Sequence, residues 1–235
     1  MLPCVILAGG LATRLRPVTE TIPKALIAIN GVPFIEHQLR LLRARGISEV
    51  HLCVGYLGEK IAEFTGDGSR YNLKLTYSFD GERLLGTAGA IRRALSGLPE
   101  SFFVLYGDSY LECDYGAVEN AFHQSGKKGL MTIYRNEGSY DTSNVQAAGG
   151  VILRYDKRVK SPEMLHIDYG LGVFRRSVFA NIPEGEVRDL ALVYQELLNE
   201  GELAAFEVPE RFYEIGSLTG IQDLEQHLLG TPEHR

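Results

Sequence analysis

The chain has few cysteines, no excess of positive charge and no long apolar run. Its three cysteines include no CxxC pair, which argues against a disulfide framework and against a zinc site. Cys4 and Cys53 lie in apolar, strand-like runs and are expected in the core. A formal net charge of −6 speaks against nucleic acid or an anionic membrane as a partner. No segment has the length and apolar character of a membrane span, and residues 1–3 leave no room for a basic leader, so the cytoplasm is the expected compartment.

Apolar runs alternate with segments of helical periodicity through the first half of the chain. The apolar runs predict strands at residues 5–8, 49–54, 73–79 and 102–106. Between them, apolar residues three and four positions apart predict helices at residues 34–45, at residues 59–64 and around Ile91 and Leu95. This order predicts an α/β protein, a Rossmann-like three-layer α/β/α fold with a mixed, mainly parallel central sheet. In such sheets, ligands bind at the carboxyl ends of the strands.

The second half of the chain has a different pattern. It predicts a helix around Val118 and Phe122, then strands at residues 130–135, 150–155 and 170–175, and finally helices at residues 189–199 and 217–229. Asp189 and Ser217 begin the last two helices with side chains that can cap backbone N–H groups. Neither a linker nor a repeat interrupts the chain, and its length suits one core, so residues 1–235 are expected to form a single domain with no further domain attached.

A glycine-rich, cationic loop follows the first strand. It reads Leu7-Ala8-Gly9-Gly10-Leu11-Ala12-Thr13-Arg14-Leu15-Arg16-Pro17 and continues to Pro23-Lys24-Ala25-Leu26. Paired glycines let backbone N–H groups approach a phosphate chain. Arg14, Arg16 and Lys24 concentrate positive charge, which a site needs if it brings together roughly six negative charges of a triphosphate and a sugar phosphate. A plain glycine turn with solvated charges would account for the same residues taken one by one.

The whole string resembles the signature of the sugar-1-phosphate nucleotidyltransferases, GGxxTRLxPxT followed by PKxL, which reads GGLATRLRPVT and PKAL in this chain. The resemblance implies a fold of the nucleotide-diphospho-sugar transferase type. It also implies that Arg14 and Lys24 hold the phosphates and stabilise the pentavalent α-phosphorus. Ala12 stands where many members have glycine, and an ordinary negative φ is expected there. The residues that the resemblance places around the nucleotide are Leu7, Ala8, Gly9, Gly10, Thr13, Arg14, Gly86 and Thr87.

Two further segments fit the same family. Residues 85–90 read LGTAGA, which resembles the segment found in guanylyltransferases acting on mannose-type or heptose phosphates. The residues that ordinarily begin a helix would also explain its glycines. Asp108 follows the apolar strand that ends at Tyr106. A carboxylate at that position suits Mg²⁺, which takes one or two carboxylates together with phosphate oxygens and water. A turn aspartate would look the same, but the resemblance makes Asp108 a catalytic residue and a metal ligand, and we expect it to converge with Lys24.

The remaining site residues follow from the resemblance alone. Glu214 stands where the family usually has a second metal-binding aspartate, and its side chain is one methylene longer. Asn144, Lys157, Asp168 and Gly170, together with Lys24, are expected to bind the sugar phosphate, although Asp156 replaces the glutamate that usually precedes the lysine. Strand-edge charges and turns would explain these residues without a site. The six histidines show no clustered spacing, and none is assigned to a metal.

The predicted reaction is therefore the transfer of a nucleotidyl group from a nucleoside triphosphate to a sugar 1-phosphate, with Mg²⁺ as cofactor and pyrophosphate as the second product. A nicotinamide-dependent oxidoreductase is disfavoured because the third glycine of GxGxxG is missing and no acidic ribose ligand follows Val54. A silent nucleotide-sugar sensor is the other alternative. It would not need to keep Arg14, Lys24 and Asp108.

The preferred donor and acceptor are a guanosine triphosphate and a manno-heptose or mannose-type 1-phosphate, as in lipopolysaccharide or capsule biosynthesis. Uridylyl or cytidylyl transfer to another sugar 1-phosphate, such as N-acetylmuramate 1-phosphate, is the alternative. The sequence does not decide the base, the sugar or the role of Glu214. It does not decide the oligomeric state either, and a homo-oligomer is one possibility.

Overall fold

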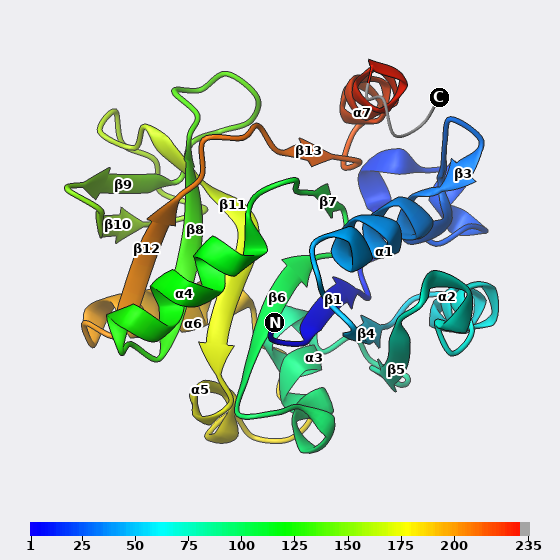
Figure 1. The fold of residues 1–235 in the computed structure, drawn as a ribbon, viewed down its shortest axis with the longest axis horizontal. Helices are drawn as coiled ribbons and strands as arrows, with labels where there is room; N and C mark the ends of the chain where they lie inside the picture. Colours follow the sequence, from blue (N-terminus) through cyan, green and yellow to red (C-terminus); the bar gives the residue numbers. More distant parts are fainter. Residues whose placement is uncertain (231–235) are drawn as a thin grey trace.

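The computed structural model describes residues 1–230 of the chain. Its centre is a nine-stranded sheet in the order β10-β9-β11-β6-β1-β4-β5, in which β8 also pairs with β11 and β12 pairs with β8 (Figure 1). β1, β4, β5 and β6 are mutually parallel, whereas β11 is antiparallel to β6 and to β8. The strands are β1 (Cys4–Ala8), β4 (Glu49–Val54), β5 (Lys74–Phe79), β6 (Ser101–Tyr106), β8 (Gly129–Arg135), β9 (Val145–Ala148), β10 (Val151–Tyr155), β11 (His166–Arg175) and β12 (Leu203–Glu207).

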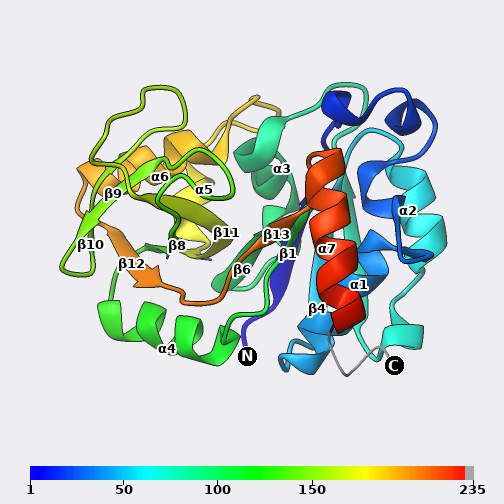
Figure 2. The same cartoon turned by 90° about the horizontal axis from the view of Figure 1, so that it is seen from above.

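Helices cover both faces of the sheet, so the predicted three-layer α/β/α fold is confirmed (Figures 1 and 2). The helices are α1 (Phe34–Ala44), α2 (Gly58–Thr65), α3 (Gly86–Ala94), α4 (Tyr115–Ser125), α5 (Ser177–Ala180), α6 (Leu190–Asn199) and α7 (Leu218–Gly230). One buried cluster joins the sheet to α1, α2 and α4, and a second joins it to α3, α5 and α6. Cys4 belongs to the first cluster and Cys53 to the second, as expected for small apolar core residues.

The parallel register brings the ends of three strands together at one edge of the sheet. Leu7 of β1 is opposite Cys53 of β4 and opposite Tyr106 of β6. The backbones just beyond these ends are very close: a Cβ on Gly107 would lie 2.4 Å from the carbonyl oxygen of Leu7. Only glycine fits there, and the segments that follow β1, β4, β5 and β6 therefore meet in a small space.

The second half of the chain departs in detail from the sequence predictions. The strand expected at residues 170–175 begins earlier, at His166, because residues 166–168 also pair with β8. An irregularity at Gly170, where φ is 101°, separates the two paired stretches. The strands β9 and β12 were not predicted. Two short ladders were not predicted either: β2 (Ala28–Ile29) with β3 (Val32–Pro33), and β7 (Ser109–Tyr110) with β13 (Tyr213–Glu214).

The last helix, α7, packs against the elements that follow the cationic loop. Its Leu224 and Leu228 are buried with Phe34 at the start of α1 and with Ile215, which follows β13. The Asn30 side-chain amide donates a hydrogen bond to the Glu225 carbonyl (2.9 Å). This packing fixes β13 beside β7, and β7 directly follows Asp108. Within residues 1–230, no helix combines the length and the apolar character needed to cross a membrane.

Candidate active site

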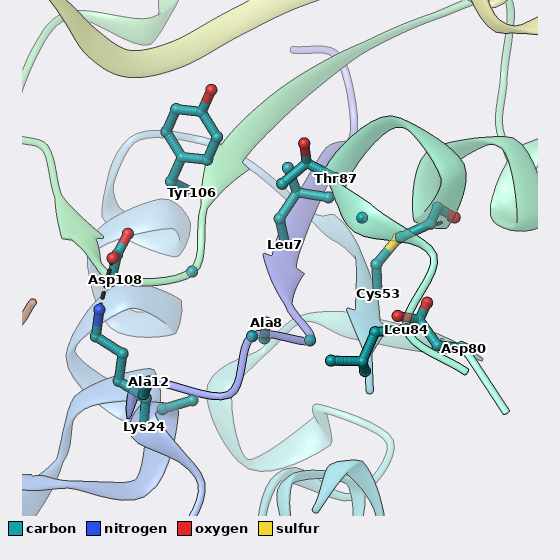
Figure 3. A pocket seen from close by; sticks show the side chains of 16 residues that line it. Leu7, Ala8, Ala12, Lys24, Cys53, Asp80, Leu84, Thr87, Tyr106 and Asp108 are labelled. Carbon is teal, nitrogen blue, oxygen red and sulfur yellow. Dashed lines mark hydrogen bonds and ion pairs between the residues drawn. The ribbon is translucent and has the colours of Figure 1, made fainter. Parts of the chain in front are cut away.

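The two groups expected to converge do so. The Lys24 ammonium donates a hydrogen bond to Asp108 Oδ2 at 2.6 Å, and the pair lies at one end of a cavity (Figure 3). Lys24 begins a 3₁₀ turn, Lys24–Leu26, whose middle residue Ala25 is buried and anchors the loop. The side chains of Lys24 and Asp108 are 17% and 31% exposed, so both remain accessible to a ligand.

The cavity beside this pair has a volume of about 270 Å³. Figure 3 shows Lys24 and Asp108 at one side, Asp80 and Cys53 at the opposite side, and Leu7 and Thr87 between them. The residues predicted to surround the nucleotide that line this cavity are Leu7, Ala8, Gly9, Gly10, Gly86 and Thr87. Thr13 lies in the same loop but not in the lining, and Arg14 lines a neighbouring cavity instead.

The expectation for Ala12 was wrong. Its φ is 48°, in the left-handed region, although alanine carries a Cβ that disfavours this conformation by roughly 1–2 kcal/mol. Two hydrogen bonds to the Ala12 carbonyl hold the turn, from the Leu15 backbone N–H (3.0 Å) and from the Thr19 hydroxyl (2.9 Å). The loop therefore holds Ala12 in a left-handed conformation that glycine adopts without this cost.

The glycines of residues 85–90 have a structural reason of their own. A Cβ on Gly89 would lie 2.4 Å from the carbonyl oxygen of Glu186, and Gly86 has a φ of 71°. The carbonyl of Arg188 accepts hydrogen bonds from the backbone N–H groups of Ala88 and Gly89. The N–H groups of Ala88 and Gly89 are thus bound by the chain itself, and Gly86, Thr87 and Ala90 are the residues of this segment that line the cavity.

A buried carboxylate, Asp80, lines the same cavity and was not predicted. It is 8% exposed, and its Oδ2 accepts a hydrogen bond from the Leu85 backbone N–H (3.1 Å). No residue among 1–230 donates a hydrogen bond to Oδ1. Burial raises the pKa of the Asp80 carboxyl above its ordinary value of 3.8, although the Leu85 N–H and Arg93 partly oppose this. Its position directly after β5 is the signal that sequence reasoning could have used.

A second cavity, of about 460 Å³, adjoins the first. Tyr106 and Asp108 line both cavities. The predicted sugar-phosphate residues other than Lys24 line the second one, together with Arg14 and Glu214. These predicted residues are Asn144, Lys157, Asp168 and Gly170. The second cavity is also lined by Asp141, Thr142 and Lys160, which are not among the predicted site residues. A pocket with Arg14, Lys157 and Lys160 in its walls suits a phosphorylated ligand.

The two carboxylates expected to bind a metal are on neighbouring elements. Glu214 pairs with Ser109 in the β13–β7 ladder, and the Ile215 backbone N–H donates to the Asp108 carbonyl at 3.0 Å. Burial raises the pKa of the Glu214 carboxyl, and the negative charges of Asp108 and Asp141 raise it further, while Lys24 and Arg14 partly oppose this. A divalent cation between two such carboxylates would relieve their repulsion, and hard oxygen donors are the ligands that Mg²⁺ takes. The residues present therefore fit the ion.

Fold and site together define a class of protein: an α/β protein that gathers cationic and acidic groups around a two-part cavity at the carboxyl ends of parallel strands. Residues 4–161 match the nucleotidyl transferase family. The chain belongs to this family, and the resemblance seen in its motifs is confirmed.

Several named proteins are similar to this chain. It is 31% identical to a UTP–glucose-1-phosphate uridylyltransferase of Synechocystis sp. over 79% of this chain and 52% of that protein. It is 31% identical to the catalytic subunit beta of a mannose-1-phosphate guanylyltransferase of Xenopus tropicalis, over 92% of this chain and 63% of that protein. A D-glycero-alpha-D-manno-heptose 1-phosphate guanylyltransferase of Campylobacter jejuni is 29% identical over 90% of this chain and 93% of its own length. The chain thus spans about half to two thirds of the first two relatives and nearly all of the third.

Solved structures share the fold. A putative glucose-1-phosphate thymidylyltransferase from Bacillus anthracis superimposes with a TM-score of 0.85 at 18% identity, over 97% of this chain and 95% of that one. HddC from Yersinia pseudotuberculosis superimposes with a TM-score of 0.80 at 24% identity, over 97% of this chain and 99% of that one. These similarities confirm the nucleotidyltransferase fold that the sequence predicted.

Proposed function

We propose that this protein transfers a nucleotidyl group to a sugar 1-phosphate and releases pyrophosphate, with guanosine triphosphate as donor and a manno-heptose or mannose-type 1-phosphate as acceptor. The observation that carries the proposal is the meeting of two cavities at Asp108, whose carboxylate is bound by Lys24 of the first cavity. The first cavity is lined by the glycine-rich loop and by the Asp80 carboxylate. The other has Arg14, Lys157 and Lys160.

In this proposal the anomeric phosphate oxygen attacks the α-phosphorus and pyrophosphate leaves on the opposite side. The attacking oxygen is already anionic, so no general base is required. Lys24, which lines the first cavity and is paired with Asp108, stabilises the charge that develops on the α-phosphate, and Arg14 in the second cavity brings the acceptor phosphate toward it. Asp108 and Glu214 would hold Mg²⁺, which supplies positive charge to the triphosphate oxygens.

The Asp80 carboxylate supports guanine as the base. Guanine presents two adjacent donors on its Watson–Crick edge, N1–H and the N2 amino group, and a carboxylate accepts both. Uracil presents one N–H between two carbonyl oxygens, which a carboxylate repels. Asp80 is at the side of the first cavity away from Lys24 and Asp108 (Figure 3), and only one of its oxygens is bound by the chain. The similarity to the guanylyltransferases of Xenopus and Campylobacter adds support.

The direct test mixes the protein and Mg²⁺ with each of four nucleoside triphosphates and with a series of sugar 1-phosphates, and it measures pyrophosphate release. We expect release with guanosine triphosphate and a manno-configured sugar 1-phosphate. Release with uridine or cytidine triphosphate alone would refute guanine but keep the reaction. If no pair gives pyrophosphate, the proposed reaction is wrong.

The variant Asp80→Asn tests the base directly. An amide accepts from N1–H but opposes the N2 amino group with a donor of its own, so kcat/KM for guanosine triphosphate should fall by about ten- to a hundredfold, as for the loss of a hydrogen bond to a charged group. Xanthosine triphosphate has a carbonyl oxygen at C2 and should improve as a substrate. Unchanged selectivity in this variant would exclude Asp80 as the base-recognising group.

A further inference from the structure

Tyr106 separates the two cavities and has no assigned role. It is the last residue of β6, directly before Gly107 and Asp108, and it lines both the cavity beside Asp80 and the cavity with Lys157. Figure 3 shows its ring beyond Asp108 and directed away from Lys24, so its hydroxyl does not take part in the Lys24–Asp108 pair.

The Tyr106 hydroxyl is part of a connected group of polar side chains. It donates a hydrogen bond to Asp168 Oδ2 (3.3 Å), and the Tyr155 hydroxyl donates to the same oxygen (3.2 Å). The other oxygen of Asp168 accepts from the Gly170 backbone N–H (3.1 Å). Burial raises the pKa of the Tyr106 phenol well above its ordinary range, and the Asp168 charge raises it further, so the phenol stays a proton donor at neutral pH.

Lys157 rests on Tyr106. Its ammonium donates to the Tyr106 hydroxyl at 3.2 Å and lies 4.7 Å from the centre of the ring. The same ammonium is 3.9 Å from Asp168 Oδ2, outside direct hydrogen-bond contact. The phenol oxygen thus accepts from Lys157 while its proton goes to Asp168, and the two opposite charges form an ion pair that stays outside hydrogen-bond contact.

Asp168 is poorly placed to touch a sugar. Its side chain is 2% exposed, and both of its oxygens are used by the chain. Lys157 is 39% exposed and faces the second cavity. A buried carboxylate with two phenol donors is a fixed anchor, whereas a partly exposed ammonium that makes one hydrogen bond has donors left for a phosphate.

We infer that Tyr106 is a positioning residue for the acceptor: its hydroxyl keeps the Lys157–Asp168 ion pair out of direct hydrogen-bond contact and holds the ammonium in the second cavity, where it binds the phosphate of the sugar. Asp168 then acts through Tyr106 and Lys157 and does not contact the sugar hydroxyls. The inference rests on the proposed function, because the second cavity is taken as the acceptor site.

The test compares Tyr106→Phe with Tyr155→Phe. Each variant removes one phenol hydrogen bond to Asp168 Oδ2, at nearly equal distance, but Tyr155 is 3% exposed and borders neither cavity. The two variants should lose similar thermal stability. In Tyr106→Phe, Lys157 can close onto Asp168, so KM for the sugar 1-phosphate should rise about tenfold or more while KM for the triphosphate stays unchanged. Tyr155→Phe should keep both constants.

Two outcomes overturn the inference: an equal rise of the acceptor KM in Tyr155→Phe, or an acceptor KM in Tyr106→Phe within twofold of the unmodified protein. A combined variant adds a check. Tyr106→Phe should raise the acceptor KM much less in a Lys157→Ala background, because both changes remove the same contact.

Calorimetric titration with mannose 1-phosphate separates this inference from the proposed reaction, because it needs no turnover. Binding that weakens in Tyr106→Phe but not in Tyr155→Phe would support the positioning role even if no pyrophosphate were released. Pyrophosphate release with an unchanged acceptor affinity in Tyr106→Phe would keep the reaction and refute the role. If the unmodified protein binds none of the sugar 1-phosphates in the series and turns none of them over with any donor, the acceptor site itself is wrong.

Discussion

Replacing Lys24 with methionine should remove most of the turnover without unfolding the protein. Methionine keeps most of the apolar stem and loses the ammonium that is 2.6 Å from Asp108 Oδ2. A unit charge about 4 Å from a developing negative charge contributes about 4 kcal/mol at an effective dielectric constant of about 20, which corresponds to roughly a thousandfold in rate. Loss of a single stabilising donor in comparable sites costs about a hundred- to a thousandfold. We therefore expect kcat to fall by about that range.

The assay is steady-state pyrophosphate release at saturating Mg²⁺ and both substrates, with circular dichroism and a thermal melt on each variant. Lys74→Met is the matched control, because Lys74 is 68% exposed and pairs with Glu49 on the surface, away from both cavities. The loop should keep its shape in Lys24→Met because Ala25 anchors it in the core. A Lys24→Met rate within tenfold of the unmodified protein would refute the role given to the ammonium.

Two further substitutions probe the carboxylates. Glu214→Gln removes one of two charges facing the proposed ion, so the Mg²⁺ concentration for half-maximal activity should rise about tenfold, and a shift below twofold would leave Asp108 as the main ligand. Asp80→Asn removes a buried charge and should raise Tm near pH 7.5 by about 2–4 °C if the gain is about 1 kcal/mol. The folded protein raises the pKa of Asp80 above 3.8, so the contribution of this group to stability is fully present below that pH and is lost as the pH rises through the folded pKa. The Tm advantage of the variant should therefore vanish below pH 3.8, and parallel melting curves from acid to neutral pH would contradict this reasoning.

Much of the first half of the fold was predictable because its strands are continuous apolar runs, which only a sheet buried on both faces accommodates. The convergence of Lys24 and Asp108 was predictable for a related reason, since both follow strands whose carboxyl ends meet at one edge. The strand β12 was not predicted, because its two alanines have low strand propensity and its pairing with β8 decides its conformation.

The contacts of Tyr106 could not be predicted from the sequence for a different reason: they join residues far apart in the chain. Its hydroxyl meets Asp168, 62 positions further along the chain, and Lys157, 51 positions further. Nothing in the local pattern of an apolar strand distinguishes a tyrosine that packs in the core from one whose hydroxyl reaches a carboxylate. The left-handed Ala12 was equally hidden, because the Thr19 hydroxyl that supports it acts across the turn.

The short β7–β13 ladder ties Glu214 to the segment that carries Asp108, through the Glu214–Ser109 pairing and the bond from Ile215 to the Asp108 carbonyl. A displacement of one of these two segments would therefore carry the other with it, because backbone pairing joins them directly.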